Sequence, residues 1–202
     1  MAQEPGEASA TVQKYRIALS FYSLLYNSLV ESLVKYLEKA LGESAGVYEL
    51  GTVLEDSIVS LGEAVRKLAE SMGRRLETVD DLLQFVNHCH EMLNKLGVSL
   101  ELFRASKMDE NHWVMETRGC RLLKSGGESI ARIIPLAIVA GFVKSLGHEA
   151  RWLISPSHIP HLCRAISIGL QPKYEYIVYY DEGVQPPACK IVIEKLDCSK
   201  YQ

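Results

Sequence analysis

The chain has 202 residues, of which 48% are hydrophobic and 23% are charged, and its formal net charge is −3. These values are typical of a globular protein, and they exclude a fibrous repeat, wholesale disorder and a general electrostatic attraction to nucleic acid or anionic membranes. The length suits one domain, so we expect residues 1–11 to form a disordered tail and residues 12–202 to form a single α+β domain.

We find no signal peptide in the sequence, and this observation together with the cysteine usage predicts a cytoplasmic protein. The first ten residues contain no apolar segment, and the longest apolar run, residues 133–143, is too short to cross a bilayer. The five cysteines are an odd number and include no CxxC motif, which predicts reduced thiols. One internal disulfide stays open as an alternative if the source is a hyperthermophile.

Three amphipathic helices are predicted in the N-terminal half. Apolar residues recur at steps of three and four over residues 12–41, over residues 50–72, and after Thr78 as far as residue 96. Thr78 is a good N-cap, and acidic residues follow it in the first turn, where they suit the helix dipole. The first of these helices would be about 45 Å long. We therefore expect it to bend, to break or to project toward a partner.

The periodicity changes from 3.6 to 2 in the C-terminal half. Alternating residues over 98–103 and 113–117 flank a turn at 107–111, which predicts a hairpin, and further strands are predicted over 149–154, 174–180 and 189–196. Between them, residues 128–146 form a helix that is apolar nearly all round, kinked or started by Pro135. The predicted fold class is α+β, with N-terminal helices packed with an antiparallel sheet of four to five strands and one central apolar helix.

Two groups of residues are candidates for chemistry. His158 and His161 would share one face of a short helix, but Cys163 would point elsewhere, and the spacing matches no standard zinc signature. They are weak metal candidates, and a surface turn leading into a short helix is the favoured alternative. Cys120 lies close to two arginines that would lower its thiol pKa, which suits a nucleophile or an acylation site. No histidine partner is identifiable, so an ordinary buried cysteine is favoured.

The order of elements resembles the 4-vinyl-reductase-type small-molecule-binding domain, which is related in fold to the Golgi-transport TRAPP subunits. The resemblance rests on the Gly-marked helix segment 61–65, the hairpin after Gly97, the Arg-Gly-Cys that ends at Cys120, and the apolar helix segment 134–143. It covers about residues 45–180. It implies a two-layer α+β fold with an interior for a hydrophobic or acyl ligand, dimerisation through helices, and a sensing or scaffolding role without catalysis.

The resemblance also implies which cysteines would matter. Cys120 and Cys163 are the nearest matches to the cysteines that bind a ligand or metal in that family. However, the family's Cys-rich strand pair is not reproduced, because the equivalent stretch, residues 163–169, reads Cys-Arg-Ala-Ile-Ser-Ile-Gly. This departure argues against a metal site. The Tyr-x-Ser-x-Arg clamp of the haem-binding relatives is absent as well, so haem is not expected.

We therefore expect a non-enzymatic module that binds a hydrophobic small molecule and forms a homodimer, with no nucleic acid partner and no assigned cofactor. The ligand would lie in a pocket between the apolar helix over residues 130–143 and the sheet, and the expected ligand-binding residues are Phe85, Cys89, Ile134, Ile138, Phe142 and Cys120. Three alternatives remain open. The same residues could simply pack the core, the chain could be a helix-mediated protein-interaction subunit without a ligand, or it could be a thiol- or metal-dependent enzyme that uses Cys120 or the His158, His161 and Cys163 group.

Overall fold

The computed structural model describes residues 43–95, 104–117, 128–183 and 189–201, together with positions 13, 32, 36, 39 and 40. Most of the predicted first helix, the strand predicted over 98–103, and Cys120 lie outside the described residues. Within the described part, no helix is long and apolar enough to cross a membrane.

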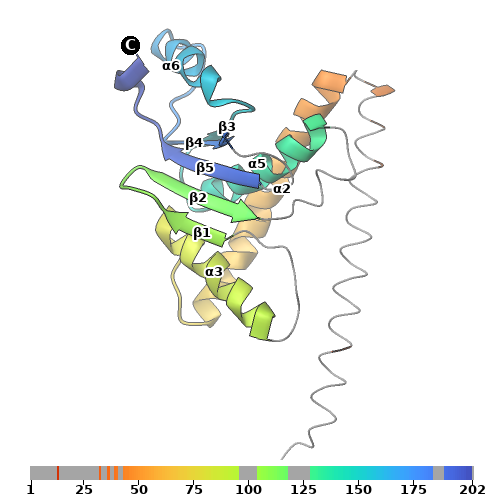
Figure 1. The fold of residues 1–202 in the computed structure, drawn as a ribbon, viewed down its shortest axis with the longest axis vertical. Helices are drawn as coiled ribbons and strands as arrows, with labels where there is room; N and C mark the ends of the chain where they lie inside the picture. The colour runs from red at the N-terminus through yellow and green to blue at the C-terminus, as the bar shows by residue number, and fades with distance from the viewer. Residues whose placement is uncertain are drawn as a thin grey trace, which may run out of the picture.

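The protein has an α+β fold built on a five-stranded sheet (Figure 1). The strands are β1 (Arg104–Lys107), β2 (His112–Thr117), β3 (Ala150–Trp152), β4 (Tyr176–Tyr180) and β5 (Cys189–Lys195). Their order is β1-β2-β5-β4-β3, and neighbouring strands are antiparallel except for β3 and β4. The parallel pair follows from the helical connection between β3 and β4, since a crossover returns the chain to the same end of the sheet. The sheet is thus mixed, and mostly antiparallel as predicted.

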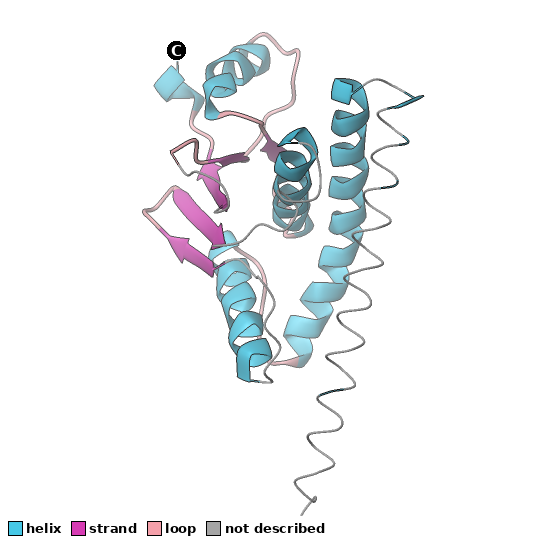
Figure 2. Cartoon of the chain, turned by 45° about the vertical axis from the view of Figure 1, so that its right-hand side comes forward, coloured by secondary structure: helices cyan, strands magenta, loops and turns pink. Residues whose placement is uncertain are grey.

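Four helices and two short 3₁₀ turns are described beside the sheet. They are α2 (Glu43–Ser71), α3 (Val79–Lys95), α5 (Glu128–Ser145), η1 (Pro156–His158), α6 (Ile159–Ser167) and η2 (Cys198–Tyr201). Figure 2 shows α5 between the sheet and α2. The predicted central apolar helix is therefore confirmed, and its most deeply buried residues, Ile134, Leu136, Ala137, Ala140 and Val143, are fully shielded from solvent.

Helix α2 begins at Glu43, ahead of the start predicted at Leu50, because a tertiary contact supports its first turns. The ring of Tyr48 lies 5.3 Å from that of Trp152 on β3. Farther along, α2 and α5 approach so closely that a Cβ on Gly141 would lie 2.7 Å from the carbonyl oxygen of Glu55. The carboxylate of Glu55 is buried at this contact and forms an ion pair with Lys144 of α5.

Helix α3 is hydrogen-bonded to the sheet at its start, through Asp80, and at its middle, through Asn87. Its first turn is capped as predicted, with the amide of Asp81 donating to Oγ1 of Thr78 at 3.2 Å. Asp80 accepts hydrogen bonds at 2.9 Å from both Lys107 Nζ and Trp113 Nε1. These contacts hold α3 beside the edge strand β1.

The two faces of the sheet pack against different helices, because the side chains of a strand alternate between faces. On β4, Tyr176 and Val178 join the main core with α5, whereas Ile177 joins a second cluster formed with α6 and η2. Helix α6 and η2 therefore cover the face opposite α5 at one corner of the sheet (Figure 1). We call this region the C-terminal corner.

Candidate functional site

A cleft of about 530 Å³ lies where the end of α2, the following turn and the end of α5 meet. It is lined by Arg66, Glu70, Arg75, Leu76, Glu77 and Leu146. Leu76 and Leu146 belong to an apolar cluster that also contains Ala69 and Phe85. We call this feature the Arg66 cleft, because it combines an apolar floor with a charged rim.

The charges of the Arg66 cleft are not equally available to a ligand. Arg75 is exposed and lies 3.8 Å from the carboxylate of Glu77. Arg66 is half-buried, and its Nε is shielded from solvent without a hydrogen-bond partner among the described residues. A buried N–H donor without a partner is costly, and Arg66 also lines the cleft, so its guanidinium is suited to donate a hydrogen bond to a ligand oxygen.

The structure brings only part of the predicted ligand set to this cleft. Phe85 is buried in the apolar cluster beneath the cleft, and Cys89 packs against the same cluster. Ile134, Ile138 and Phe142 lie on α5 and are not members of that cluster. Periodicity identified apolar residues correctly, but it could not show which of them face the end of α2.

The thiol of Cys89 is poorly suited to nucleophilic chemistry. Burial raises its pKa, and the opposing effect of the nearby Arg74 guanidinium is smaller. Its thiolate fraction at neutral pH is therefore below that of an ordinary cysteine. Arg66 was not singled out from the sequence, because a lone arginine on a helix resembles any solvated residue.

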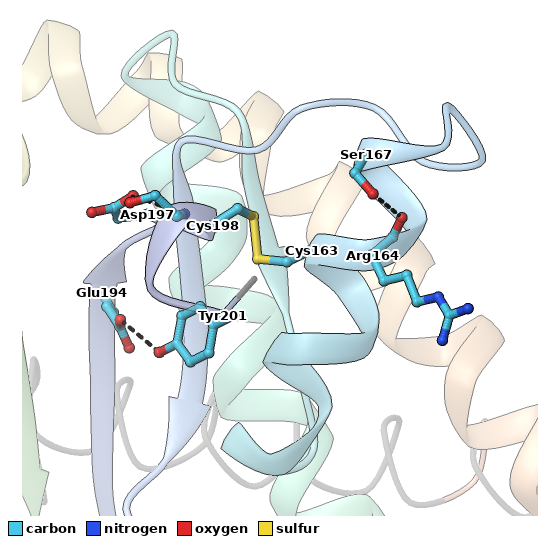
Figure 3. The surroundings of a disulfide bond; sticks show 8 residues. Cys163, Arg164, Ser167, Glu194, Asp197, Cys198 and Tyr201 are labelled. Atoms are coloured by element: carbon cyan, nitrogen blue, oxygen red, sulfur yellow. Dashed lines mark hydrogen bonds between the residues drawn. A yellow bond between two sulfur atoms is a disulfide. The ribbon is translucent and has the colours of Figure 1, made fainter.

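A disulfide joins Cys163 of α6 to Cys198 of η2 at the C-terminal corner (Figure 3). The prediction that the thiols are reduced is wrong for this pair, and the single internal disulfide left open as an alternative is present. A pocket of about 370 Å³ adjoins the bond. It is lined by Pro160, His161, Cys163, Arg164, Ser167 and Tyr201. The side chain of Arg164 points away from the sulfur atoms (Figure 3).

This bond bears directly on the metal candidates. With its sulfur bonded to Cys198, Cys163 has no thiolate to offer a metal ion. His158 ends η1 and His161 lies on α6, and both are exposed. In the described part of the chain, no group of three or more His, Cys, Asp and Glu residues is placed to hold a metal ion.

A buried carboxylate lies next to the disulfide. Glu194 of β5 is 4% exposed and accepts hydrogen bonds from the hydroxyls of Tyr179 at 2.8 Å and Tyr201 at 3.4 Å. His112 Nε2 lies 3.7 Å from the same carboxylate. Burial, together with the adjacent carboxylate, raises the pKa of Tyr179, so its hydroxyl remains a donor at neutral pH.

Helix α2 carries the exposed apolar side chains Val53, Leu61 and Leu68, and exposed Met72 follows its last residue. A helix-mediated partner would find its apolar contacts at such side chains, and the expected homodimer stays a prediction.

The geometry thus offers a cleft with an unpaired arginine donor and a disulfide-bridged corner. A scan against protein-family models finds no match to this sequence, and a comparison with the curated proteins finds none either.

Proposed function

We propose that this chain is a non-enzymatic binding module for a hydrophobic or acyl small molecule that carries an anionic group, and that the Arg66 cleft is its binding site. One observation carries the proposal: the cleft of about 530 Å³ has a floor that is continuous with the apolar cluster around Phe85. Its volume falls within the roughly 300–1,000 Å³ of small-molecule sites.

The two parts of such a ligand would contact different parts of the cleft. Its apolar body would cover Leu76 and Leu146, and burial of apolar surface stabilises a complex by about 25 cal/mol per Å². Its anionic group would accept a hydrogen bond from the Arg66 guanidinium, which lines the cleft, and hydrogen bonds to charged groups contribute about 1.5–3 kcal/mol. Glu70 and Glu77 repel an anion at the outer rim, so binding depends on the partly buried arginine.

The surroundings favour binding over catalysis. Cys89, which packs against the apolar cluster beneath the cleft, has a raised thiol pKa, and the cleft lining contains no serine, histidine or cysteine among its described residues. Nucleophilic catalysis needs an activated nucleophile beside a base, and this lining does not provide one.

The test uses two probes with ten carbons each, the anionic decanoate and the neutral decanol, with binding to the full chain measured by isothermal titration calorimetry. Arg66→Gln should weaken decanoate binding by about tenfold or more while leaving decanol nearly unchanged, since only the charged probe uses the guanidinium. Lys67→Gln is the matched control, because it removes the same charge from an exposed neighbouring position outside the cleft lining.

Two results would contradict the proposal. In one, neither probe binds at concentrations up to their solubility. In the other, Arg66→Gln and Lys67→Gln weaken decanoate binding equally, which would mean that the probe responds to net charge and not to the cleft.

A further inference from the structure

We propose that Cys163–Cys198 is a thiol–disulfide exchange site whose substrate is an external dithiol, and that its reduction opens the C-terminal corner without unfolding the rest of the chain. This inference is independent of the Arg66 cleft. It rests on three features of the described residues: the unequal burial of the two sulfur-bearing residues, the attachment of η2, and the pocket beside the bond.

The two cysteines differ in their access to solvent. Cys163 is 3% exposed and packs with Ile159 and Ile177, whereas Cys198 is only partly buried. Exchange requires a thiolate to reach one sulfur of the disulfide, and access helps to decide which sulfur is attacked. The geometry therefore directs the attack to Sγ of Cys198.

The reaction is balanced with a dithiol as the reductant. The first thiolate forms a bond to Cys198 Sγ, the disulfide bond breaks, and its electron pair goes to Cys163 Sγ, which takes a proton from water. The second thiolate of the same molecule then attacks the reductant's own sulfur in the mixed disulfide and releases Cys198 as a thiol. The dithiol ends as a cyclic disulfide, and the protein gains two thiols.

Once this bond is broken, the 3₁₀ turn η2 is held by the partly buried packing of Cys198 and Tyr201 against the Ile159 and Ile177 cluster and by few hydrogen bonds. None of its residues is fully buried. Its hydrogen bonds in the described structure run within residues 197–200, apart from the 3.4 Å contact between Tyr201 and Glu194. Segments with little buried apolar surface open at low free-energy cost. Reduction should therefore release η2 as a unit.

Helix α6 is attached more firmly. Ile159 and Cys163 are buried against Ile177 of β4, and Leu162 packs against the same cluster. These apolar contacts do not depend on the disulfide, so α6 should stay in place when η2 leaves. The departure of Tyr201 would remove one wall of the pocket, and the Cys163 thiol would then line an open groove beside Glu194 (Figure 3).

The experiment uses the full chain purified without reductant. Millimolar dithiothreitol, added under native conditions and followed by iodoacetamide, should leave both Cys163 and Cys198 alkylated with the circular dichroism spectrum unchanged. Hydrogen–deuterium exchange of the η2 amides should rise by about tenfold or more, while exchange in α6 and β5 should change by less than about twofold. A monothiol in excess should be trapped as a mixed disulfide on Cys198.

Two variants make the outcome independent of the reductant. Cys198→Ser should show the rapid η2 exchange without any dithiol, because it cannot form the bond. Lys200→Gln changes an exposed side chain of the same turn, leaves the hydrogen bond from its amide to Asp197 in place, and should keep both the disulfide and the slow exchange. The proposal is overturned if the purified chain lacks the bond, if reduction requires denaturant, if α6 exchanges together with η2, or if the monothiol is found on Cys163.

Discussion

One side chain of α3 forms hydrogen bonds with the backbone at the outer edge of β1. The carboxamide of Asn87 on α3 donates to the carbonyl oxygen of Ala105 at 2.7 Å and accepts from the amide of the same residue at 2.9 Å. Asn87 therefore occupies the hydrogen-bonding position that a further strand would take beside β1. Unpaired edges of this kind are sites of intermolecular strand pairing.

Replacing Asn87 with alanine should lower the free energy of unfolding by about 2 kcal/mol, since each hydrogen bond contributes a net 0.5–1.5 kcal/mol and two are lost. The site is partly buried, so water restores only part of this loss. For a chain of this size the melting temperature should fall by roughly 4–8 °C. Asn87→Asp keeps the size of the side chain and its acceptor but loses the donor. A loss of stability in this variant would therefore report the missing hydrogen bond and not a change in side-chain size.

The assay is urea unfolding followed by circular dichroism, with Gln84→Ala as the control, because Gln84 is exposed on the same helix and reports the gain in helix propensity. Static light scattering at increasing concentration should show association for Asn87→Ala alone. The reasoning is refuted if Asn87→Ala and Gln84→Ala have the same unfolding midpoint and neither associates.

Three further predictions concern packing, pH and the disulfide. Gly141→Ala should destabilise the protein by about 1–3 kcal/mol in thermal unfolding, because its new Cβ would lie 2.7 Å from the carbonyl oxygen of Glu55 on α2. The control, Ser60→Ala on the exposed side of α2, should have little effect. The hydrogen bonds from Lys107 and Trp113 hold the pKa of Asp80 below its usual 3.8. The contribution of Asp80 to stability is therefore complete above that pH and is lost as the pH falls through the folded-state pKa. The stability difference between wild type and Asp80→Asn, measured by urea unfolding, should shrink in acid, and a constant difference would contradict the assignment. The unfolding free energy of Cys198→Ser should be about 4 kcal/mol below that of the disulfide-bonded wild type, because the bond closes a loop with a 35-residue separation and lowers the entropy of the unfolded chain. An unchanged urea midpoint would count against this prediction.

Sequence periodicity identified most of the described elements because each helix presents an apolar stripe to the core. The short helix expected to follow the turn near His158 is α6. Strand β1 was missed because its burial pattern contains one buried residue, Ala105, and therefore gives no alternation. The region of strong alternation just before it, residues 98–103, lies outside the described residues.

The candidate sites were harder to predict because they depend on contacts between distant residues. Cys163 and Cys198 are 35 residues apart, and nothing in the residue pattern pairs them. Arg66 differs from its exposed neighbours only in the burial of its Nε, which depends on how the end of α2 meets α5. Phe85 and Cys89 belong to the apolar stripe predicted for α3, and they lie in the apolar cluster beneath the cleft without being among its lining residues.

The position of β5 has a consequence for how this chain folds. Residues 189–195 form the middle strand of the sheet, between β2 and β4. The hairpin of β1 and β2 therefore has no further strand to pair with until these residues are added. His112 pairs with Glu194, a separation of 194 − 112 = 82 residues. Pairing at such a distance requires the entropy of a long loop to be lost before any contact compensates for it, which slows folding. During synthesis, the edges of β2 and β4 that pair with β5 would therefore stay unpaired until the last strand joins them, and this is the interval in which a chaperone would matter most.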